Sequence, residues 1–269
     1  MTRPDAAAIA DIVRDVAATE IVPRFRNLAA GDIREKRPGD LVTIADEAAE
    51  QALTRRLSAL LPGSLVVGEE AVAADPAVLD LLKSDRPVWV IDPVDGTMNF
   101  AKGHEGFAVI LALVQHGRTL GGWLHDPLTG RMAVAEQGSG TWLDGTRLQV
   151  RRVTHRPLGR LHGLAGANAH RKKLEAHVGE GRLLDRIGAL RCAGQEYLTL
   201  LTGEADFSVY RRIMPWDHAA GALMYQEAGG HAALLTNGED YSPAALEGGL
   251  LLASDFDVWN AVRGALTAE

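Results

Sequence analysis

Two aspartates that follow an apolar run give this sequence its clearest indication of chemistry. Residues Val88–Ile91 have the length and β-branched content of a buried strand, and Asp92 and Asp95 follow them. Carboxylates at the end of a buried strand are costly unless a positive group compensates them. The proline between them and Gly96 after them make a turn tight enough to direct both carboxylates, and the Val94 carbonyl, at one point. Such converging oxygen ligands suit Mg²⁺ better than zinc or copper. The alternative is a solvated Asp-Pro-Val-Asp-Gly turn.

Two further acidic residues stand at the ends of predicted elements. Glu69 follows a short predicted strand at residues 64–67, and Asp217 lies where a helix is predicted to begin, in the position of an N-cap. Ligands in open α/β proteins gather outside the carboxyl ends of strands, and a helix amino terminus favours phosphate. The acids are therefore predicted to share one site. The alternative for Asp217 is a purely structural cap.

The elements that must position these acids change character along the chain. The predicted helices cover residues 5–28, 45–61, 76–83, 196–202 and 219–227. The predicted strands cover residues 64–67, 88–91, 107–115, 121–125, 131–136, 140–143, 163–167 and 190–192. Turn residues between the strands of residues 106–150 favour an antiparallel meander, and after residue 155 strands and helices alternate. We predict an α/β protein with an α+β half, residues 1–155, and an α/β half, residues 156–269, packed as one unit without a linker.

Composition excludes several classes of protein. The 269 residues, 46% hydrophobic and 23% charged, are typical of a globular protein with a substantial core. The formal charge of −7 argues against a nucleic-acid-binding surface but not against a small phosphorylated ligand. Cys192 is the only cysteine, which excludes an internal disulfide and a thiol-based metal site and fits a small buried hydrophobe. With no signal peptide and no membrane span in the pattern, we expect a cytoplasmic protein that does not bind membranes.

Four segments resemble the inositol monophosphatase family over residues 5 to 260. Residues 92–100, Asp-Pro-Val-Asp-Gly-Thr-Met-Asn-Phe, resemble its first signature, and residues 216–221, Trp-Asp-His-Ala-Ala-Gly, its second. Gly68-Glu69-Glu70 occupies the place of the family's additional metal-binding glutamate, and residues 126–145 are similar to its hairpin region. The resemblance implies a layered α-β-α-β-α sandwich of the sugar-phosphatase type, with the metal site between the two halves.

The resemblance also implies two or three Mg²⁺ ions per active site. One would be held by Glu69, Asp92 and the Val94 carbonyl, and a second by Asp92, Asp95 and Asp217. Glu69 would also reach a third ion and counts among the catalytic residues. Metal ions neutralise the phosphate oxygens, lower the pKa of bound water and stabilise the leaving alkoxide, so no covalent nucleophile is needed.

The remaining catalytic roles implied by the resemblance fall on Thr97 and Asp46. Thr97 would share a proton with the attacking water, and Asp46 would orient it. Gly96 and Thr97 would offer backbone N–H groups to the phosphate, and Asp95 and Asp217 would also contact the substrate. The alternative for Thr97 is a hydroxyl that only closes the turn after Gly96.

The sequence departs from the family pattern at a position that contacts the substrate in inositol-specific members. Inositol-specific members carry a glutamate seven residues before the second-signature aspartate, and here that position is Tyr210, followed by Arg211 and Arg212. We therefore expect Tyr210 and Arg211 to contact the substrate, and the arginine pair favours a doubly anionic one, because guanidinium binds phosphate or carboxylate in a bidentate way. The alternative is that both arginines face solvent.

Three further features are candidates for substrate contacts. Ala193 lies in the segment Cys192–Glu196 that matches a substrate-side segment of the family, and Gln195 and Glu196 either touch the substrate or begin a helix. His218 either hydrogen-bonds the leaving group or is a packed helix residue. The basic cluster at residues 170–173 is interpreted as a solvated loop or helix start rather than a substrate contact.

The resulting hypothesis is a Mg²⁺-dependent phosphomonoesterase for a small phosphorylated metabolite, working as a homodimer. Alternative activities in the family are fructose-1,6-bisphosphatase, histidinol-phosphatase and 3′(2′),5′-bisphosphate nucleotidase. A catalytically silent metal- or phosphate-binding regulator is the alternative from another class. Such proteins lose a metal carboxylate, whereas this chain retains Glu69, Asp92, Asp95 and Asp217. An RNA-associated role gains no support from the acidic charge.

Overall fold

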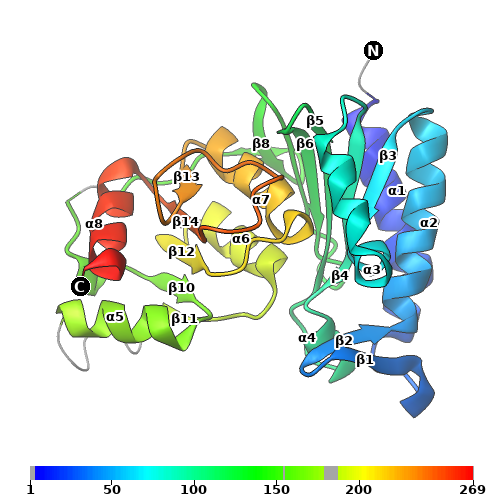
Figure 1. The fold of residues 1–269 in the computed structure, drawn as a ribbon, viewed down its shortest axis with the longest axis horizontal. Coiled ribbons are helices and arrows are strands. Elements are labelled where there is room, and N and C mark those ends of the chain that lie inside the picture. The colour runs from blue at the N-terminus through cyan, green and yellow to red at the C-terminus, as the bar shows by residue number, and fades with distance from the viewer. Residues whose placement is uncertain (1–3, 154, 179–186, 269) are drawn as a thin grey trace.

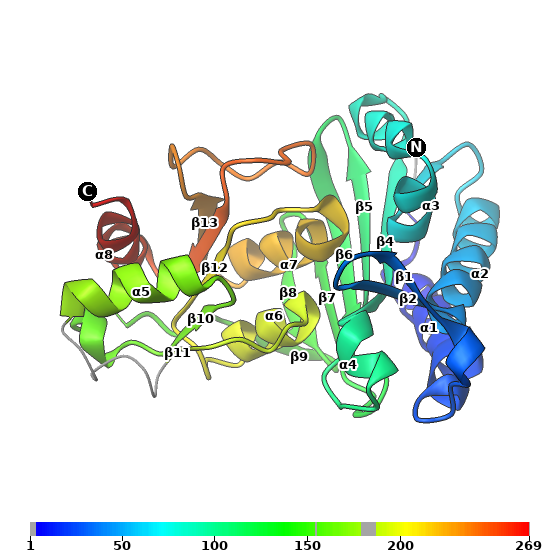
Figure 2. The ribbon, with the colours of Figure 1, turned by 60° about the horizontal axis from the view of Figure 1, so that its bottom comes forward.

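Five layers of helices and sheets make up the structure, a computed structural model that describes residues 4–153, 155–178 and 187–268. A seven-stranded and a five-stranded sheet face each other across a central pair of helices, and further helices cover the outer face of each sheet (Figures 1 and 2). The outer helices are α1 (Ala6–Val16) and α2 (Ile44–Leu60) on one side, and α5 (Asn168–Val178) and α8 (Phe256–Thr267) on the other. The central pair is α6 (Ala193–Leu201) and α7 (Pro215–Glu227). The predicted layered α/β fold is confirmed.

The seven-stranded sheet is a meander with one parallel strand at its edge. Its strands follow chain order: β3 (Leu65–Gly68), β4 (Val88–Asp95), β5 (Ala108–Gln115), β6 (Arg118–His125), β7 (Met132–Glu136), β8 (Gly140–Leu143) and β9 (Thr146–Leu148). β3 and β4 are parallel, and the later neighbours are antiparallel. The predicted meander is confirmed, although β9 was not predicted.

The five-stranded sheet is mixed. Its order is β11 (Ile187–Gly188), β10 (Gly163–Ala165), β12 (Phe207–Tyr210), β14 (Leu250–Ala253) and β13 (His231–Leu234). The strand predicted at residues 190–192 is wrong: these residues form the connection from β11 to α6, and Arg191 has a φ of 56°. A positive φ is incompatible with a regular strand.

Several other predicted elements differ from the structure in their type of helix or in their bounds. The helix predicted at residues 5–28 is α-helical only to Val16 and then continues as a π-turn, Ala17–Ile21, and a 3₁₀ turn, Val22–Arg24. The predicted helix at residues 76–83 is a 3₁₀ helix, Pro76–Lys83. Residues 31–40, predicted only as a connection, contribute most of a hairpin formed by β1 (Ile33–Arg37) and β2 (Asp40–Thr43). Short helices α3 (Glu69–Ala74) and α4 (Thr97–Ala101) follow β3 and β4.

Side-chain alternation along β4 connects the layers. Val88 and Val90 point to the core shared with α6 and α7, whereas Trp89 and Ile91 point to the core under α1 and α2. Because both faces of this strand are covered, all of its residues are buried. A charged side chain at the end of this strand is therefore surrounded by apolar groups, which disfavour its charged form.

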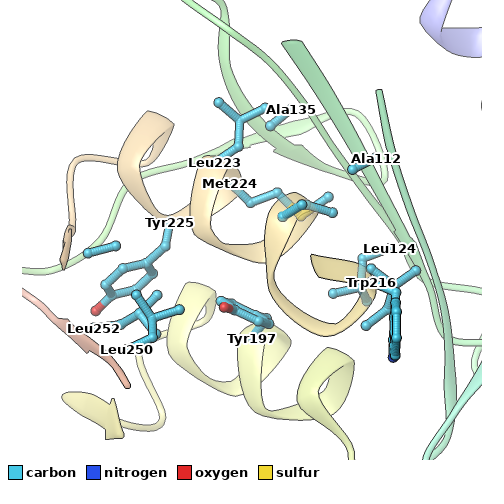
Figure 3. Close-up of a cluster of buried hydrophobic side chains, with 14 of the residues drawn as sticks. Ala112, Leu124, Ala135, Tyr197, Trp216, Leu223, Met224, Tyr225, Leu250 and Leu252 are labelled. Carbon is cyan, nitrogen blue, oxygen red and sulfur yellow. The ribbon is translucent and has the colours of Figure 1, made fainter. Parts of the chain in front are cut away.

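The central helices pack against both sheets. Met224 of α7 shares one buried cluster with Ala112 and Leu124 of the first sheet and Leu252 of the second (Figure 3). α6 and α7 approach closely because Gly221 faces the Tyr197 ring, where a Cβ would come within 2.3 Å of a ring carbon. No helix in the described part of the chain is long and apolar enough to cross a membrane. The division into halves near residue 155 stays a prediction; that residue lies between the last strand of the first sheet and the first of the second.

Candidate active site

The two aspartates of the first motif lie at the end of β4. Asp92 is 1% exposed and Asp95 is 8% exposed, and the pairing of β4 with β5 shifts register between them. The Asp92 carboxylate accepts a hydrogen bond from the Val94 N–H at 3.1 Å, which fixes its direction. Because β3 runs parallel to β4, with Gly68 opposite Ile91, the two strands end at the same edge and α3 begins there.

Asp217 reaches the same edge from α7. The prediction that it is the N-cap is wrong: Met214 occupies that position and Asp217 lies in the first turn. The reason is Pro215, which is favoured at the first helical position because its φ is preset and it lacks an N–H. Asp92, Asp95 and Asp217 each offer a carboxylate oxygen, and these oxygens all lie within 4.8 Å of one another.

The electrostatics of these three carboxylates call for a cation. Burial and the neighbouring carboxylates, Glu69 first, raise the pKa of Asp92 well above its ordinary value. Burial and then repulsion from Asp95 raise the pKa of Asp217 well above its ordinary value. A buried all-oxygen set of like charges suits a hard divalent cation, which would cancel the repulsion. The donor set therefore fits the metal that the sequence predicts.

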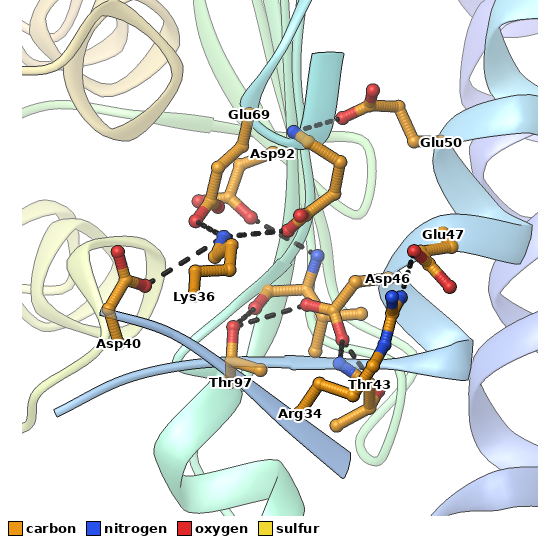
Figure 4. Close-up of polar contacts among 12 residues, drawn as sticks. Arg34, Lys36, Asp40, Thr43, Asp46, Glu47, Glu50, Glu69, Asp92 and Thr97 are labelled. Atoms are coloured by element: carbon orange, nitrogen blue, oxygen red, sulfur yellow. Dashed lines mark hydrogen bonds and ion pairs between the residues drawn. The ribbon is translucent and has the colours of Figure 1, made fainter. Parts of the chain in front are cut away.

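Glu69 stands beside this group and is paired with a lysine. Lys36 of β1 places its Nζ 2.8 Å from Glu69 Oε1 and 2.9 Å from Glu70 Oε1 (Figure 4). Burial lowers the pKa of Lys36, but the two glutamates outweigh it and raise that pKa. Glu50 of α2 accepts the Glu70 N–H and so fixes the start of α3. Sequence reasoning missed Lys36, because nothing in a run of alternating charges marks one lysine.

Thr97 and Asp46 meet next to the acids. The Thr97 hydroxyl lies 3.1 Å from Asp46 Oδ1 and 3.0 Å from the Val94 carbonyl oxygen (Figure 4). Asp46 is held by a capping box at the start of α2, in which its carboxylate accepts the Thr43 N–H at 2.8 Å. Burial, the largest influence, raises the pKa of Asp46 to about 6. The predicted pair is thus brought together, and the hydroxyl oxygen keeps lone pairs for a further partner.

Asp95 also anchors the start of α6. It accepts the Ala193 N–H at 3.1 Å, the Gly194 N–H at 2.6 Å and the Cys192 thiol at 3.0 Å. Cys192 therefore does more than the buried hydrophobe expected from the sequence, since it is the N-cap of α6. The backbone N–H of Ala193 is directed at Asp95. Gly96 has a φ of 85°, which non-glycine residues rarely adopt, at the turn from β4 to α4.

A cavity of about 700 Å³ opens beside the acids. Its lining comprises Asp95, Ala165, Gly166, Ala167, Arg171, Gly188, Ala189, Arg191, Cys192, Ala193, Glu196, Val209, Tyr210, Arg211, Arg212, Asp217 and His218. The structure thus brings the predicted substrate residues Ala193, Tyr210 and Arg211 to one cavity with the acids. The basic cluster at residues 170–173 lies near the start of α5, as one of the predicted alternatives had it, and Arg171 of the cluster also lines the cavity.

Sequence reasoning missed Arg191 as a cavity residue. It lies in the segment that the sequence predicted as a strand, so no periodicity marks its direction. His218 is buried, with Nδ1 3.1 Å from the Tyr197 hydroxyl and Nε2 3.1 Å from the Arg212 carbonyl oxygen. Burial lowers the pKa of His218 to about 4, so the ring is neutral and packed, as the second of the two alternatives had it.

The layered fold and the carboxylate centre at the ends of β4 and α7 define an α/β protein with an acidic group that could hold a metal ion beside a cavity. The sequence model of the inositol monophosphatase family matches residues 3–265. The chain belongs to the inositol monophosphatase family and is by class a phosphoric monoester hydrolase.

Individual relatives agree with this family. The chain is 32% identical over 201 residues, 73% of each protein, to a fructose-1,6-bisphosphatase/inositol-1-monophosphatase of Thermotoga maritima. It is 31% identical over 234 residues, 84% of this chain and 83% of the relative, to Nus factor SuhB of Escherichia coli K12. A solved IMPase structure from Thermotoga maritima superposes with a TM-score of 0.80 at 26% identity, over 97% of this chain and 95% of that one.

Proposed function

We propose that the protein hydrolyses the monoester of a small phosphorylated metabolite in a Mg²⁺-dependent reaction. The observation that carries this proposal is the group of three carboxylate oxygens within 4.8 Å of one another, contributed by Asp92, Asp95 and Asp217. The hydrogen-bonded pair Thr97–Asp46 beside it supplies the group that a water nucleophile needs. Family membership fixes the reaction class, and these residues support its assignment to this site.

We assign the metal to the predicted residues. Glu69, Asp92, Asp95, Asp217 and the Val94 carbonyl would hold two or three Mg²⁺ ions. Bound there, the ions supply charge neutralisation for the phosphate oxygens and a lowered pKa for bound water. Carboxylate and carbonyl oxygens are the ligands that Mg²⁺ prefers.

The chain's own residues orient the water. With Asp46 ionised, the Thr97 hydroxyl donates to Asp46 Oδ1 and its oxygen accepts a hydrogen bond from water. The water oxygen bonds to phosphorus and the ester P–O bond breaks; one proton of the water stays on the product phosphate, and the other ends on the leaving oxygen, so that the alcohol leaves neutral. Because the pKa of Asp46 is raised to about 6, chiefly by burial, we expect kcat to fall as the pH drops through that value. The N–H groups of Gly96 and Thr97 are assigned to the phosphate.

Phosphate release is the direct test. The wild type should release inorganic phosphate from small monoesters only when Mg²⁺ is present, and Asp92→Asn should release none above background. Binding of Mg²⁺ without turnover of any monoester would instead support the silent regulator. Isothermal titration with Mg²⁺ on the same samples separates a lost metal site from a lost reaction.

Two further assignments complete the proposal. A homodimer rests on the family resemblance, and light scattering on the purified full chain tests it. A cytoplasmic location fits a chain whose single cysteine, Cys192, can form no internal disulfide. Fractionation of cells that produce the protein tests the location.

A further inference from the structure

The lining of the cavity beside the acids also carries positive charge. Arg191 precedes α6, and Arg211 and Arg212 follow β12. All three are exposed and line the same cavity as Asp95 and Asp217. Two segments that are separate in the sequence therefore contribute arginines to the lining of one cavity.

These guanidinium groups differ from other arginines near this sheet. Arg156 is paired with Asp206 at 3.1 Å, and Arg171 with Glu175 at 3.1 Å. Within residues 4–153, 155–178 and 187–268, no ion pair or side-chain hydrogen bond engages the guanidinium groups of Arg191, Arg211 or Arg212. Positive groups in a cavity lining that have no partner attract an anionic group of a ligand.

The backbone next to Arg191 is held by two polar side chains. Glu196, which is 5% exposed, accepts the N–H of the preceding residue, Leu190, at 2.9 Å. Asn99 donates its side-chain amide to the Leu190 carbonyl at 3.1 Å. These contacts maintain the φ of 56° at Arg191, a strained backbone conformation that non-glycine residues rarely adopt. The connection is therefore built to present this side chain.

The segment after β12 is fixed in a similar way. His218 Nε2 donates to the Arg212 carbonyl oxygen, because a carbonyl can only accept, and Nδ1 then accepts from the Tyr197 hydroxyl. The Tyr210 ring lies 4.5 Å from the His218 ring, centroid to centroid. The charge of Arg212 also acts on Asp217, whose pKa it lowers against the larger effect of burial. Arg212 thus lies toward the acids.

We propose that the substrate of this site carries a second anionic group, a phosphate or a carboxylate, which Arg191 and Arg211 bind while the acid centre holds the phosphate to be cleaved. This inference rests on the proposed function. Guanidinium groups bind either anion through paired hydrogen bonds. A cavity of about 700 Å³ has the volume of a small-metabolite site. Tyr210 itself brings no carboxylate that would repel this anion, and the Glu196 carboxylate of the same cavity accepts the Leu190 N–H.

Matched pairs of esters test the proposal. One arm compares fructose 1,6-bisphosphate with fructose 1-phosphate and fructose 6-phosphate. The other compares 2-phosphoglycerate with glycerol 2-phosphate, which has a hydroxymethyl group in place of the carboxylate. We expect the wild type to favour the doubly anionic ester at least tenfold in kcat/KM in one arm, and the arm that responds identifies the anion. Added NaCl should reduce that preference, because salt screens exposed charges.

The variant Arg191→Gln/Arg211→Gln shows whether the arginines cause the preference. We expect the ratio to fall below about threefold, mainly through a higher KM for the doubly anionic ester. Arg212 is left in place because its charge acts on Asp217. Arg55 is an exposed arginine on α2 outside the cavity, and Arg55→Gln, which removes one positive charge there, should leave the ratio unchanged.

The failures of the two proposals are distinguishable. Equal turnover of both members of each pair, or a preference that survives Arg191→Gln/Arg211→Gln, overturns the second-anion site while the phosphatase assignment stands. Absence of Mg²⁺-dependent release from every ester overturns both.

Discussion

Asparagine in place of Asp92 is expected to stabilise the metal-free protein and to abolish its turnover. Asp92 is buried, and its pKa is raised well above the ordinary value by burial and then by Glu69 and the other acids. Asparagine has the same shape, retains the oxygen that accepts the Val94 N–H and can donate to Asp217. The substitution removes a charge that only a cation compensates, so stability and activity should change in opposite directions.

The size of the gain follows from the spacing of the carboxylates. Unit charges 4.8 Å apart repel by about 3.5 kcal/mol at an effective dielectric constant near 20. Uptake of a proton relieves this repulsion, and for a group with an ordinary pKa near 3.9 that uptake costs about 4 kcal/mol at pH 7. The penalty from Asp92 cannot exceed this cost. We expect Asp92→Asn to gain about 2–4 kcal/mol in the free energy of unfolding, or roughly 5–10 °C in Tm.

The pH dependence gives the prediction a sign. A carboxyl whose folded pKa is raised contributes stability that is complete below its unfolded pKa and is lost as the pH rises through the folded pKa. The advantage of Asp92→Asn should therefore be small near pH 4 and large at pH 8. Urea unfolding in the presence of EDTA measures it at both values. Saturating Mg²⁺ should stabilise the wild type by about 2.7 kcal/mol at a hundred times its Kd, and the variant by less.

Asp126→Asn is the matched control. Asp126 is also buried, and burial raises its pKa, but hydrogen bonds from Thr129 and others outweigh this and lower that pKa. Its replacement should cost about 1–3 kcal/mol, because backbone donors lose a charged acceptor. If Asp92→Asn is the less stable protein at pH 8 in EDTA, or if its gain does not change with pH, burial and the neighbouring acids do not raise the pKa of Asp92.

Three more substitutions test the site. Thr97→Val should lower kcat by about 10²–10⁴-fold, and Thr97→Ser should restore much of it; equal rates for both variants would contradict the role of the hydroxyl. Gly194→Ala should cost about 1–3 kcal/mol in urea unfolding, because its Cβ would lie 2.7 Å from Ala108 Cβ and 3.2 Å from Asp95 Oδ2. Lys36→Met should lower the Mg²⁺ concentration that gives half of the maximal Tm shift, because the ammonium group competes for Glu69. An unchanged midpoint for that variant would show that the ion pair does not oppose the metal.

Patterns of neighbouring residues correctly predicted most strands of the seven-stranded sheet. The β-branched run before Asp92 and the Gly- and Asp-containing turns of residues 106–150 are properties of neighbouring residues, and β4 to β8 follow them. The prediction that Asp217 is the N-cap was wrong because it overlooked the proline two residues earlier, which prefers the first position of a helix.

The rest of the site depends on contacts between distant segments. β1 became a strand by pairing with β2, and its alternation is hidden because most of its residues are charged. Lys36 then meets Glu69 from a different element. Arg191 faces the cavity because Glu196 and Asn99 hold its connection, and neither residue lies in the same predicted element. Tertiary structure of this kind overrides local propensity.

The central helix pair has a consequence for how the molecule comes apart. α7 contributes Asp217 to the acid centre and, through Met224, joins the cluster that reaches Leu250 and Leu252 of the second sheet. If the chain were divided between the two sheets, each fragment would expose a large apolar face, so neither fragment is expected to fold on its own. The molecule should unfold as a single cooperative unit. Local opening of the five-stranded sheet, which is remote from the acids, should also displace Asp217.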